Sequence, residues 1–157
     1  MGEKIPVRIR EANREDIPEI LSHRRGMYED MDYTDQGALD AVVSTSEPYF
    51  SAALLDGSFR GWLALAGERV VAGGGIVISP WPTHPYEYAC RKATILNLYT
   101  YPDYRRRGIA RELMKTMIEW CREEGFDSVS LHASKHGQPL YEALGFEPTN
   151  EMRLKLR

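Results

Sequence analysis

One stretch of the sequence constrains the fold more than any other: an apolar run, a short basic turn that contains a glycine, and a long amphipathic pattern. Residues 94–100 are rich in apolar and β-forming side chains around a lone polar Asn97, which is typical of a buried central strand. From about Gly108 to Glu124, apolar residues recur at steps of three and four, which predicts a helix with one face in the core. Gly125 stands at the position of a helix C-cap. A strand followed by a helix in this way predicts a right-handed crossover to a parallel strand.

The remaining patterns alternate between strand and helix, which predicts a mixed α/β sheet. Strands at 59–66 and 70–78 flank a short turn at 67–69, and such hairpins pair antiparallel. Together with the parallel crossover, they predict a mixed central sheet of about six to seven strands with helices on both faces. Before the hairpin we expect a strand at 7–10, a helix from Asn13 to about 27–31, and a helix from about Gly37 to Leu55 that Pro48 interrupts. A proline-rich loop at 80–85 follows the hairpin, and strands at 94–100 and 127–132 flank the helix that begins near Gly108. The chain then continues with a short helix at 138–144 and closing strands at Phe146 and 152–156.

Composition excludes several classes of protein. The 157 residues are enough for one domain, which we place at 1–157. A net charge of -3 argues against a general nucleic-acid-binding protein, which carries a basic excess. No apolar run is long enough for a signal peptide or a membrane span, and Cys90 and Cys121 lack the spacing of a metal site or a disulfide framework. We therefore expect a cytoplasmic protein with no metal and no membrane or nucleic-acid partner, and we leave a homodimer open.

The turn at 104–110 has the features of a phosphate site. It lies at the start of the predicted helix, where the first backbone N–H groups have no intrahelical partner and the helix dipole is positive. Gly108 and Ala110 leave the backbone accessible, and three arginines at 105–107 add charge for a pyrophosphate. An arginine triplet on its own is equally typical of a solvated surface patch. The strand before it and the helix after it favour the phosphate site, although the spacing is not that of a Walker A loop or a dinucleotide fingerprint.

The pattern Arg105-x-x-Gly108-x-Ala110 resembles the acyl-CoA signature of the GNAT superfamily, the Gcn5-related N-acetyltransferases, which is usually Gln/Arg-x-x-Gly-x-Gly/Ala. The resemblance extends from about 93 to 146 and includes the block Leu-Tyr-Glu-Ala-Leu-Gly-Phe at 140–146. It implies a GNAT-like fold, acetyl-CoA as cosubstrate, and transfer of the acetyl group to a primary amine by direct attack in a ternary complex. A non-catalytic acyl-CoA-binding sensor or interaction module is the alternative.

The resemblance also implies the cofactor contacts. The strand before the turn would splay from the next strand through a bulge, which frees main-chain groups for the pantetheine arm. Backbone amides of the turn would hold the pyrophosphate. Many relatives have an asparagine seven residues before the tyrosine of the 140–146 block, where this chain has a serine of shorter reach. The implied cofactor residues are Leu98, Tyr99 and Thr100 on the strand, Arg105, Arg106, Arg107, Gly108, Ile109 and Ala110 in the turn, and Ser134.

The same resemblance points to candidate catalytic residues. Tyr141 occupies the position at which the family often has a general acid toward the CoA thiolate. Some relatives have a glutamate as general base on the strand before the turn, whereas this strand offers Asn97, which could position a water or the acceptor but cannot act as a base. His84, Glu87 and His132 are further candidates for the base, and each has an ordinary surface or structural explanation. We therefore take Tyr141 and Asn97 as the candidate catalytic residues.

By the same resemblance, the acceptor would lie between the first helices and the loop at 80–91. Acidic and aromatic side chains gather at the end of the first predicted helix, and they suit a cationic amine. They also suit a solvated helix end. The candidate acceptor-binding residues are Tyr28, Glu29 and Met31, and the acceptor could be a small metabolite, a polyamine, an antibiotic or a protein amino group.

Overall fold

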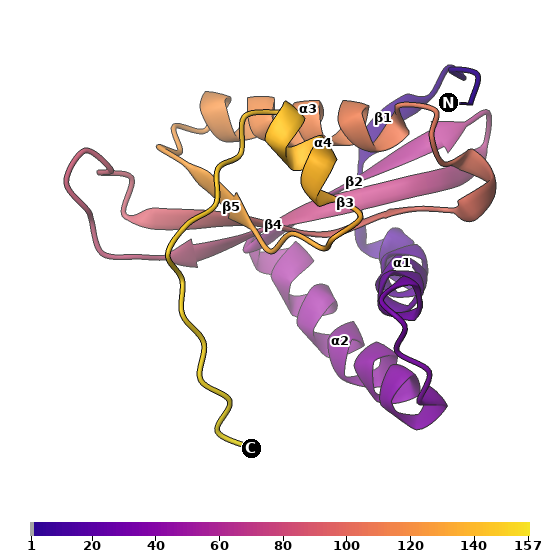
Figure 1. Cartoon of the computed structure of the whole chain (residues 1–157), viewed down its shortest axis with the longest axis horizontal. Coiled ribbons are helices and arrows are strands. Elements are labelled where there is room, and N and C mark those ends of the chain that lie inside the picture. The colour runs from indigo at the N-terminus through magenta and orange to yellow at the C-terminus, as the bar shows by residue number, and fades with distance from the viewer. Residues whose placement is uncertain (1) are drawn as a thin grey trace.

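The computed structural model describes residues 2–157, in which a five-stranded sheet carries helices on both faces (Figure 1). α1 and α2 cover one face of the sheet, and α3 and α4 cover the other. The strands are β1 (Arg8–Glu11), β2 (Phe59–Ala66), β3 (Arg69–Pro80), β4 (Arg91–Thr100) and β5 (Val129–Leu131). The helices are α1 (Ile17–Asp30), α2 (Gln36–Asp56), α3 (Ile109–Glu123) and α4 (Gln138–Ala143), with short 3-10 turns at Arg14–Asp16 and Pro102–Tyr104.

The strands follow the order β1-β2-β3-β4-β5, and every neighbouring pair is antiparallel except β4 and β5. Because α3 joins this parallel pair, the predicted crossover and the mixed α/β sheet are confirmed. The sheet has five strands within residues 2–157 rather than the six to seven expected. Phe146 and 152–156, predicted as closing strands, form no ladder. Phe146 packs against Tyr141, and residues 152–156 run away from the sheet as an extended segment (Figure 1). An alternating pattern gives a strand only where a neighbouring strand pairs with it.

α2 continues through Pro48, where the sequence predicted an interruption. A proline inside a helix leaves the carbonyl four residues earlier without its donor, which here is the carbonyl of Ser44. Both residues lie on the exposed side of α2, so water can take the place of the missing N–H group. Leu39 and Phe50 are buried on either side of Pro48. Packing of both halves of the helix therefore outweighs the local cost of the proline.

The sheet separates two hydrophobic clusters. On the α3 side, Leu113, Met114 and Met117 are fully buried, which confirms the amphipathic pattern of this helix. On the other side, Phe50 and Phe59 pack edge to face with their ring centroids 4.8 Å apart. β4 contributes side chains to both clusters, so the turn that follows β4 starts from a strand held on both faces.

Candidate functional site

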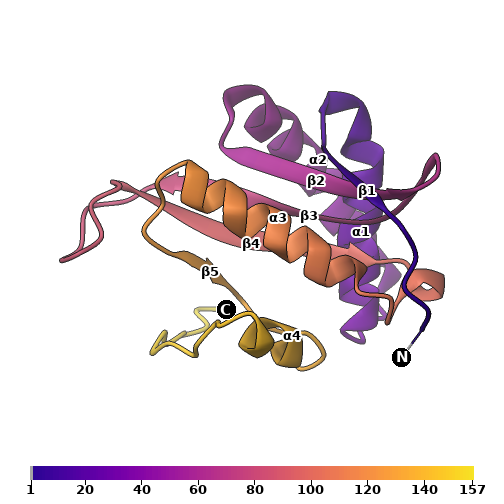
Figure 2. The same cartoon turned by 90° about the horizontal axis from the view of Figure 1, so that it is seen from above.

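β4 and β5 separate toward the end of β4 that leads into the turn. They pair only over Ala93–Ile95 and Val129–Leu131, and beyond these residues they diverge (Figure 2). β4 continues paired with β3 alone, so the edge of Leu96–Thr100 that faces β5 has no ladder partner. Main-chain N–H and C=O groups at such an edge can bind an extended, amide-bearing ligand.

The bulge in this strand lies between β4 and β3 rather than between β4 and β5. Gly73 pairs with Tyr99 and Gly75 pairs with Leu96, so β4 has one residue more than β3 between these pairs. Asn97 lies within this extra length in a left-handed conformation, with φ of 61°. A bulge bends its strand and increases its twist, which accounts for the divergence of β4 from β5.

The turn from Arg105 to Gly108 connects β4 to α3 and leaves the start of the helix open. Gly108 has φ of 79°, a left-handed conformation that favours glycine, and a β-carbon there would meet no atom within 4 Å. The Glu112 N–H donates to the Gly108 carbonyl at 3.2 Å, which closes the first helical turn. The N–H groups of 109–111 precede this bond and have no helical carbonyl to bind. Donors beside open space at a helix start fit a phosphate group.

The arginines of the turn differ in what they contact. Arg105 donates to the Thr100 carbonyl at 2.8 Å and to the Asp30 carboxylate at 2.6 Å, so it ties the turn to the end of α1. Arg106 is exposed, and its carbonyl accepts from the Gly2 N–H at 2.9 Å. The Arg105 guanidinium is therefore engaged within the protein. Arg107 donates to the Glu3 carbonyl at 3.5 Å, and Arg106 and Arg107 both add positive charge at the turn.

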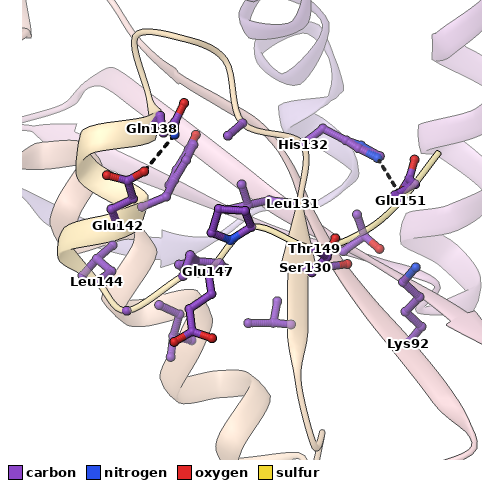
Figure 3. Close-up of a pocket in the computed structure, with 18 residues that line it drawn as sticks. Lys92, Ser130, Leu131, His132, Gln138, Glu142, Leu144, Glu147, Thr149 and Glu151 are labelled. Atoms are coloured by element: carbon purple, nitrogen blue, oxygen red, sulfur yellow. Dashed lines mark hydrogen bonds and ion pairs between the residues drawn. The ribbon is translucent and has the colours of Figure 1, made fainter. Parts of the chain in front are cut away.

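A groove of about 760 Å³ lies between β5 and α4 (Figure 3). Tyr141 of α4 lines this groove, and its ring packs against Gly137, where a β-carbon would stand 2.7 Å from the ring. Burial raises the pKa of Tyr141, so the hydroxyl stays protonated at neutral pH. A protonated hydroxyl can donate to a departing thiolate, as the predicted role of general acid demands.

The two candidate catalytic residues lie on opposite faces of the sheet. Tyr141 packs on the α3 side, whereas the Asn97 side chain points toward α1. The Asn97 amide donates to the Ile20 carbonyl at 3.0 Å, and the residue is 3% exposed. Ser134, predicted to contact the cofactor, accepts from the Gly137 N–H at 3.2 Å in the loop before α4. Asn97 and Ser134 thus each hold a neighbouring segment in place, and their roles toward a ligand stay predictions.

A polar cluster between α1 and β4 was not predicted from the sequence. His23 is 1% exposed, and its Nε2 lies 3.2 Å from Oε1 of Glu19, at an angle too oblique for a good hydrogen bond. The Tyr101 hydroxyl donates to the same oxygen at 2.8 Å and lies 3.0 Å from the Ser22 hydroxyl. The neighbouring His23 and, second, the Tyr101 hydroxyl hold the pKa of Glu19 below its usual value. A glutamate four residues before a histidine in an apolar helical pattern was the signal in the sequence.

The residues predicted to bind the acceptor lie at the C-terminal end of α1. The Tyr28 hydroxyl accepts from the Arg24 guanidinium at 3.3 Å, and Glu29 accepts from Arg25 at 3.0 Å. Met31 is 42% exposed just beyond the helix. Tyr28 and Glu29 therefore already have cationic partners within α1, and recognition of a cationic amine there stays a prediction.

The candidates for the general base are dispersed. His84 and Glu87 pair with each other through two backbone hydrogen bonds in the loop between β3 and β4, at the end of the sheet opposite the turn (Figure 1). β4 has 10 residues, so this loop lies about 30 Å from the turn. His132 follows β5, and its Nε2 lies 3.9 Å from the Glu151 carboxylate. His84 and Glu87 thus lie far from the turn, and a role of either as the base stays a prediction.

The fold and the turn have counterparts in known proteins. Residues 19–146 match the model of the acetyltransferase (GNAT) family. A Mus musculus protein described as a probable N-acetyltransferase family 8 member 5 is 29% identical over 124 residues, which make up 76% of this chain and 50% of that protein. A GCN5-related N-acetyltransferase from Ralstonia eutropha JMP134 is 32% identical, with a TM-score of 0.90 over 96% of this chain and 99% of its own. A Clostridium acetobutylicum protein described as a predicted acetyltransferase, and solved with acetyl-CoA, is 27% identical, with a TM-score of 0.85 over 97% of this chain and 96% of its own.

This chain belongs to the acetyltransferase (GNAT) family, because the family model matches most of its length. The resemblance inferred from the turn and from the block at 140–146 is therefore confirmed. The chain spans about half the length, or less, of the mammalian relatives it matches. Within the described residues, no helix is long and apolar enough to cross a membrane, and no three His, Cys, Asp or Glu side chains are grouped as metal ligands.

Proposed function

We propose that this chain is an N-acetyltransferase that moves an acetyl group from acetyl-CoA to a primary amine by direct attack in a ternary complex. The observation that carries the proposal is the separation of β4 from β5 beside the open turn at the start of α3. A pantetheine arm needs a strand edge with free main-chain groups, and a pyrophosphate needs unpartnered N–H donors and positive charge. The two features follow one another along the chain, in the order in which the cofactor presents those groups. The related Clostridium acetobutylicum protein solved with acetyl-CoA supports the same cosubstrate.

Acetyl-CoA would lie along the edge of β4 and end at the turn. The main chain of Leu98–Thr100 would bind the pantetheine arm, and the amides of 105–110 would hold the pyrophosphate with the charge of Arg106 and Arg107. The cofactor supplies an acetyl group already activated as a thioester. The task left to the protein is to orient it, to admit the amine and to manage two protons.

Tyr141 would protonate the departing thiolate. Its half-buried ring, fixed against Gly137, holds the hydroxyl in one place, and burial keeps it protonated. Asn97 would act as a positioning residue that holds α1 on β4 through the Ile20 carbonyl. The proton lost by the amine would pass to solvent water, because Glu19, which lies on the face where the acceptor is expected, has a pKa below its usual value and is therefore a poor base.

The proposal also covers the extent of the domain, the cellular location and the alternative function. One acyl-CoA-binding domain would cover residues 1–157, and a cytoplasmic location is favoured by two free cysteines, one exposed and one buried. A sensor or interaction module that binds acyl-CoA without turnover is the alternative. It is favoured by the absence of a carboxylate on β4 and by the serine at position 134.

Thermal melting with acetyl-CoA tests the binding half of this proposal, with NAD and sulfate as controls. A ligand present at 100 times its Kd stabilises the folded state by about 2.7 kcal/mol, which raises the Tm by several degrees. We expect acetyl-CoA to raise the Tm, and NAD and sulfate to leave it unchanged. No shift at millimolar concentration would contradict the proposal.

Thiol release in the presence of a panel of amines tests the catalytic half. Tyr141→Phe should keep the acetyl-CoA melting shift and lower kcat by about 100-fold, because only the proton donor is lost. An unchanged kcat would exclude Tyr141 as the acid. Binding without thiol release for any amine would favour the sensor.

A further inference from the structure

Arg24 of α1 is a half-buried cation whose capacity for hydrogen bonds is largely unused. Its guanidinium donates only to two neutral oxygens, at 3.5 Å to Oδ1 of Asn97 and at 3.3 Å to the Tyr28 hydroxyl. Its Nε is buried and has no hydrogen-bond partner within residues 2–157, and none of the ion pairs formed there includes this side chain. A buried donor without a partner on a charged group destabilises the folded protein, unless a ligand satisfies it.

The next residue of the same helix shows that acidic side chains are not scarce beside α1. Arg25 donates to Glu29 at 3.0 Å, to Asp40 at 2.7 Å and to Gln36 at 2.7 Å. The end of α1 and the start of α2 therefore supply two carboxylates to Arg25, while Arg24, one position earlier, has none. The two neighbouring arginines thus differ in what remains for them to bind.

Aromatic side chains surround the unpaired guanidinium. Its central carbon lies 5.3 Å from the centre of the Tyr28 ring and 5.9 Å from the centre of the Phe50 ring. Burial raises the pKa of the Tyr49 hydroxyl, and the positive charge of Arg24 opposes this rise, which places the guanidinium near α2 as well. Aromatic rings lower the local dielectric constant, so an anion that enters here is attracted more strongly than it would be at an open surface.

Arg24 lies where the reacting end of the cofactor is expected. In the proposed complex the pyrophosphate is at the turn and the pantetheine arm runs back along β4 from Thr100 to Leu98, so the thioester would follow beside Asn97. The Asn97 side chain, which Arg24 contacts, points toward α1, on the face of the sheet opposite Tyr141. An acceptor held by Arg24 would therefore approach the thioester from the α1 face, and the thiolate would leave toward the α3 face.

From these observations we infer that the acceptor amine carries a carboxylate and that Arg24 binds it. A carboxylate can accept two N–H donors of one guanidinium at once. Because Arg24 lies beside the expected thioester, the carboxylate and the amine must be only a few bonds apart, as they are in an α-amino acid. The same positive charge disfavours a polyamine, which would bring further cations next to Arg24.

The reaction itself is the proposed acetyl transfer, on which this inference rests for turnover but not for binding. The amine nitrogen forms a bond to the acetyl carbon, and the C–S bond of the thioester breaks. The thiolate takes the Tyr141 proton, which water replaces, and the amine releases its own proton to water. Arg24 takes no part in these steps and acts as the residue that selects and positions the acceptor.

Thiol release with matched pairs of amines gives the first test, in which each α-amino acid of a panel is compared with its own carboxamide. The carboxamide has the same shape without the negative charge. Arg24→Gln should lower kcat/KM for a good amino acid about 30-fold and leave that for its carboxamide unchanged, because only the carboxylate loses its charged partner. Arg24→Lys keeps the charge without the guanidinium fork and should restore part of the preference.

Arg25→Gln is the matched control, since it makes the same change one residue further along the helix and should keep the preference of the wild type. Circular dichroism would show that each variant is folded. The inference is wrong if the ratio of kcat/KM for the acid to kcat/KM for the carboxamide is the same in the wild type and in Arg24→Gln.

A binding measurement separates this inference from the proposed transfer. The N-acetyl amino acids of the panel can be titrated calorimetrically into the protein with CoA bound, which needs no turnover. The wild type should bind at least one of them, with a Kd about 30-fold lower than that of Arg24→Gln. If acetyl-CoA binds and no amine releases thiol, the transfer fails and this titration alone decides the role of Arg24. If amines without a carboxylate are acetylated and no N-acetyl amino acid binds, the transfer stands and the inference is wrong.

Discussion

Replacement of Gly108 by aspartate should weaken CoA binding at least 100-fold and leave the fold intact. A β-carbon at Gly108 would meet no atom within 4 Å, so the only structural cost is the left-handed backbone, with φ of 79°. Aspartate and asparagine tolerate this conformation better than other residues, at a cost of about 1 kcal/mol.

The effect on binding comes from charge. A carboxylate at the turn would lie about 5 Å from a bound pyrophosphate, and at an effective dielectric constant of about 20 each pair of unit charges repels by about 3 kcal/mol. This corresponds to a roughly 100-fold higher Kd. Gly108→Asn is the matched control, because it has the same size and backbone preference without the charge.

Isothermal titration with CoA would measure both variants, after circular dichroism has shown that each is folded. The aspartate variant should bind at least 100-fold more weakly than the asparagine variant, and added salt should narrow the difference. Equal dissociation constants for the two variants would refute the phosphate site at the turn.

Two further predictions concern the α1 face of the sheet. The pKa of Glu19 lies below its ordinary value because of His23 and Tyr101, so the stability that this carboxylate adds is complete above its unfolded-state pKa and is lost as pH falls through the lower folded-state pKa. Below about pH 4.5, the Tm of Glu19→Gln should therefore fall less steeply with decreasing pH than the Tm of the wild type. The same dependence of Tm on pH in both proteins would contradict a stabilising role for the Glu19 carboxylate. Asn97→Ala leaves the Ile20 carbonyl without its donor and puts alanine at φ of 61°, so the free energy of unfolding in urea should fall by about 3 kcal/mol. Asn97→Gly also removes the hydrogen bond but adopts the left-handed backbone without strain, so its free energy of unfolding should fall by less than that of Asn97→Ala. Equal decreases in the two variants would show that the left-handed conformation costs alanine nothing.

The parts of the fold that the sequence predicted are those set by local chemistry. The strand at 94–100, the turn with Gly108 and the helix after it each follow from periodicity and backbone preference over a few residues. The predicted interruption at Pro48 was wrong because the packing of α2 on the sheet outweighs one missing hydrogen bond, and a local sequence pattern does not show that packing. The segment at 152–156 misled it for the opposite reason, since its strand pattern is clear but no strand of its own chain lies beside it.

The sequence predicted the candidate site only where residues consecutive in the chain form it. The turn was found because glycine, arginine and a helix start are consecutive in the chain. The pairing of Tyr101 with Glu19 joins residues 82 positions apart, and periodicity does not show it. Periodicity also does not show the contact of Arg105 with Asp30. The sequence analysis assigned the charge of Arg105 to a phosphate, whereas in the structure its guanidinium donates to the Asp30 carboxylate.

The main-chain hydrogen bond from the Gly2 N–H to the Arg106 carbonyl has a practical consequence for all of these measurements. A purification tag fused ahead of Gly2 begins at the turn itself, so a polyhistidine tract there would place titratable cations beside the groups that are to bind CoA. A tag at the other end would extend the segment from 152. Binding constants should therefore be measured on protein from which the tag has been cleaved.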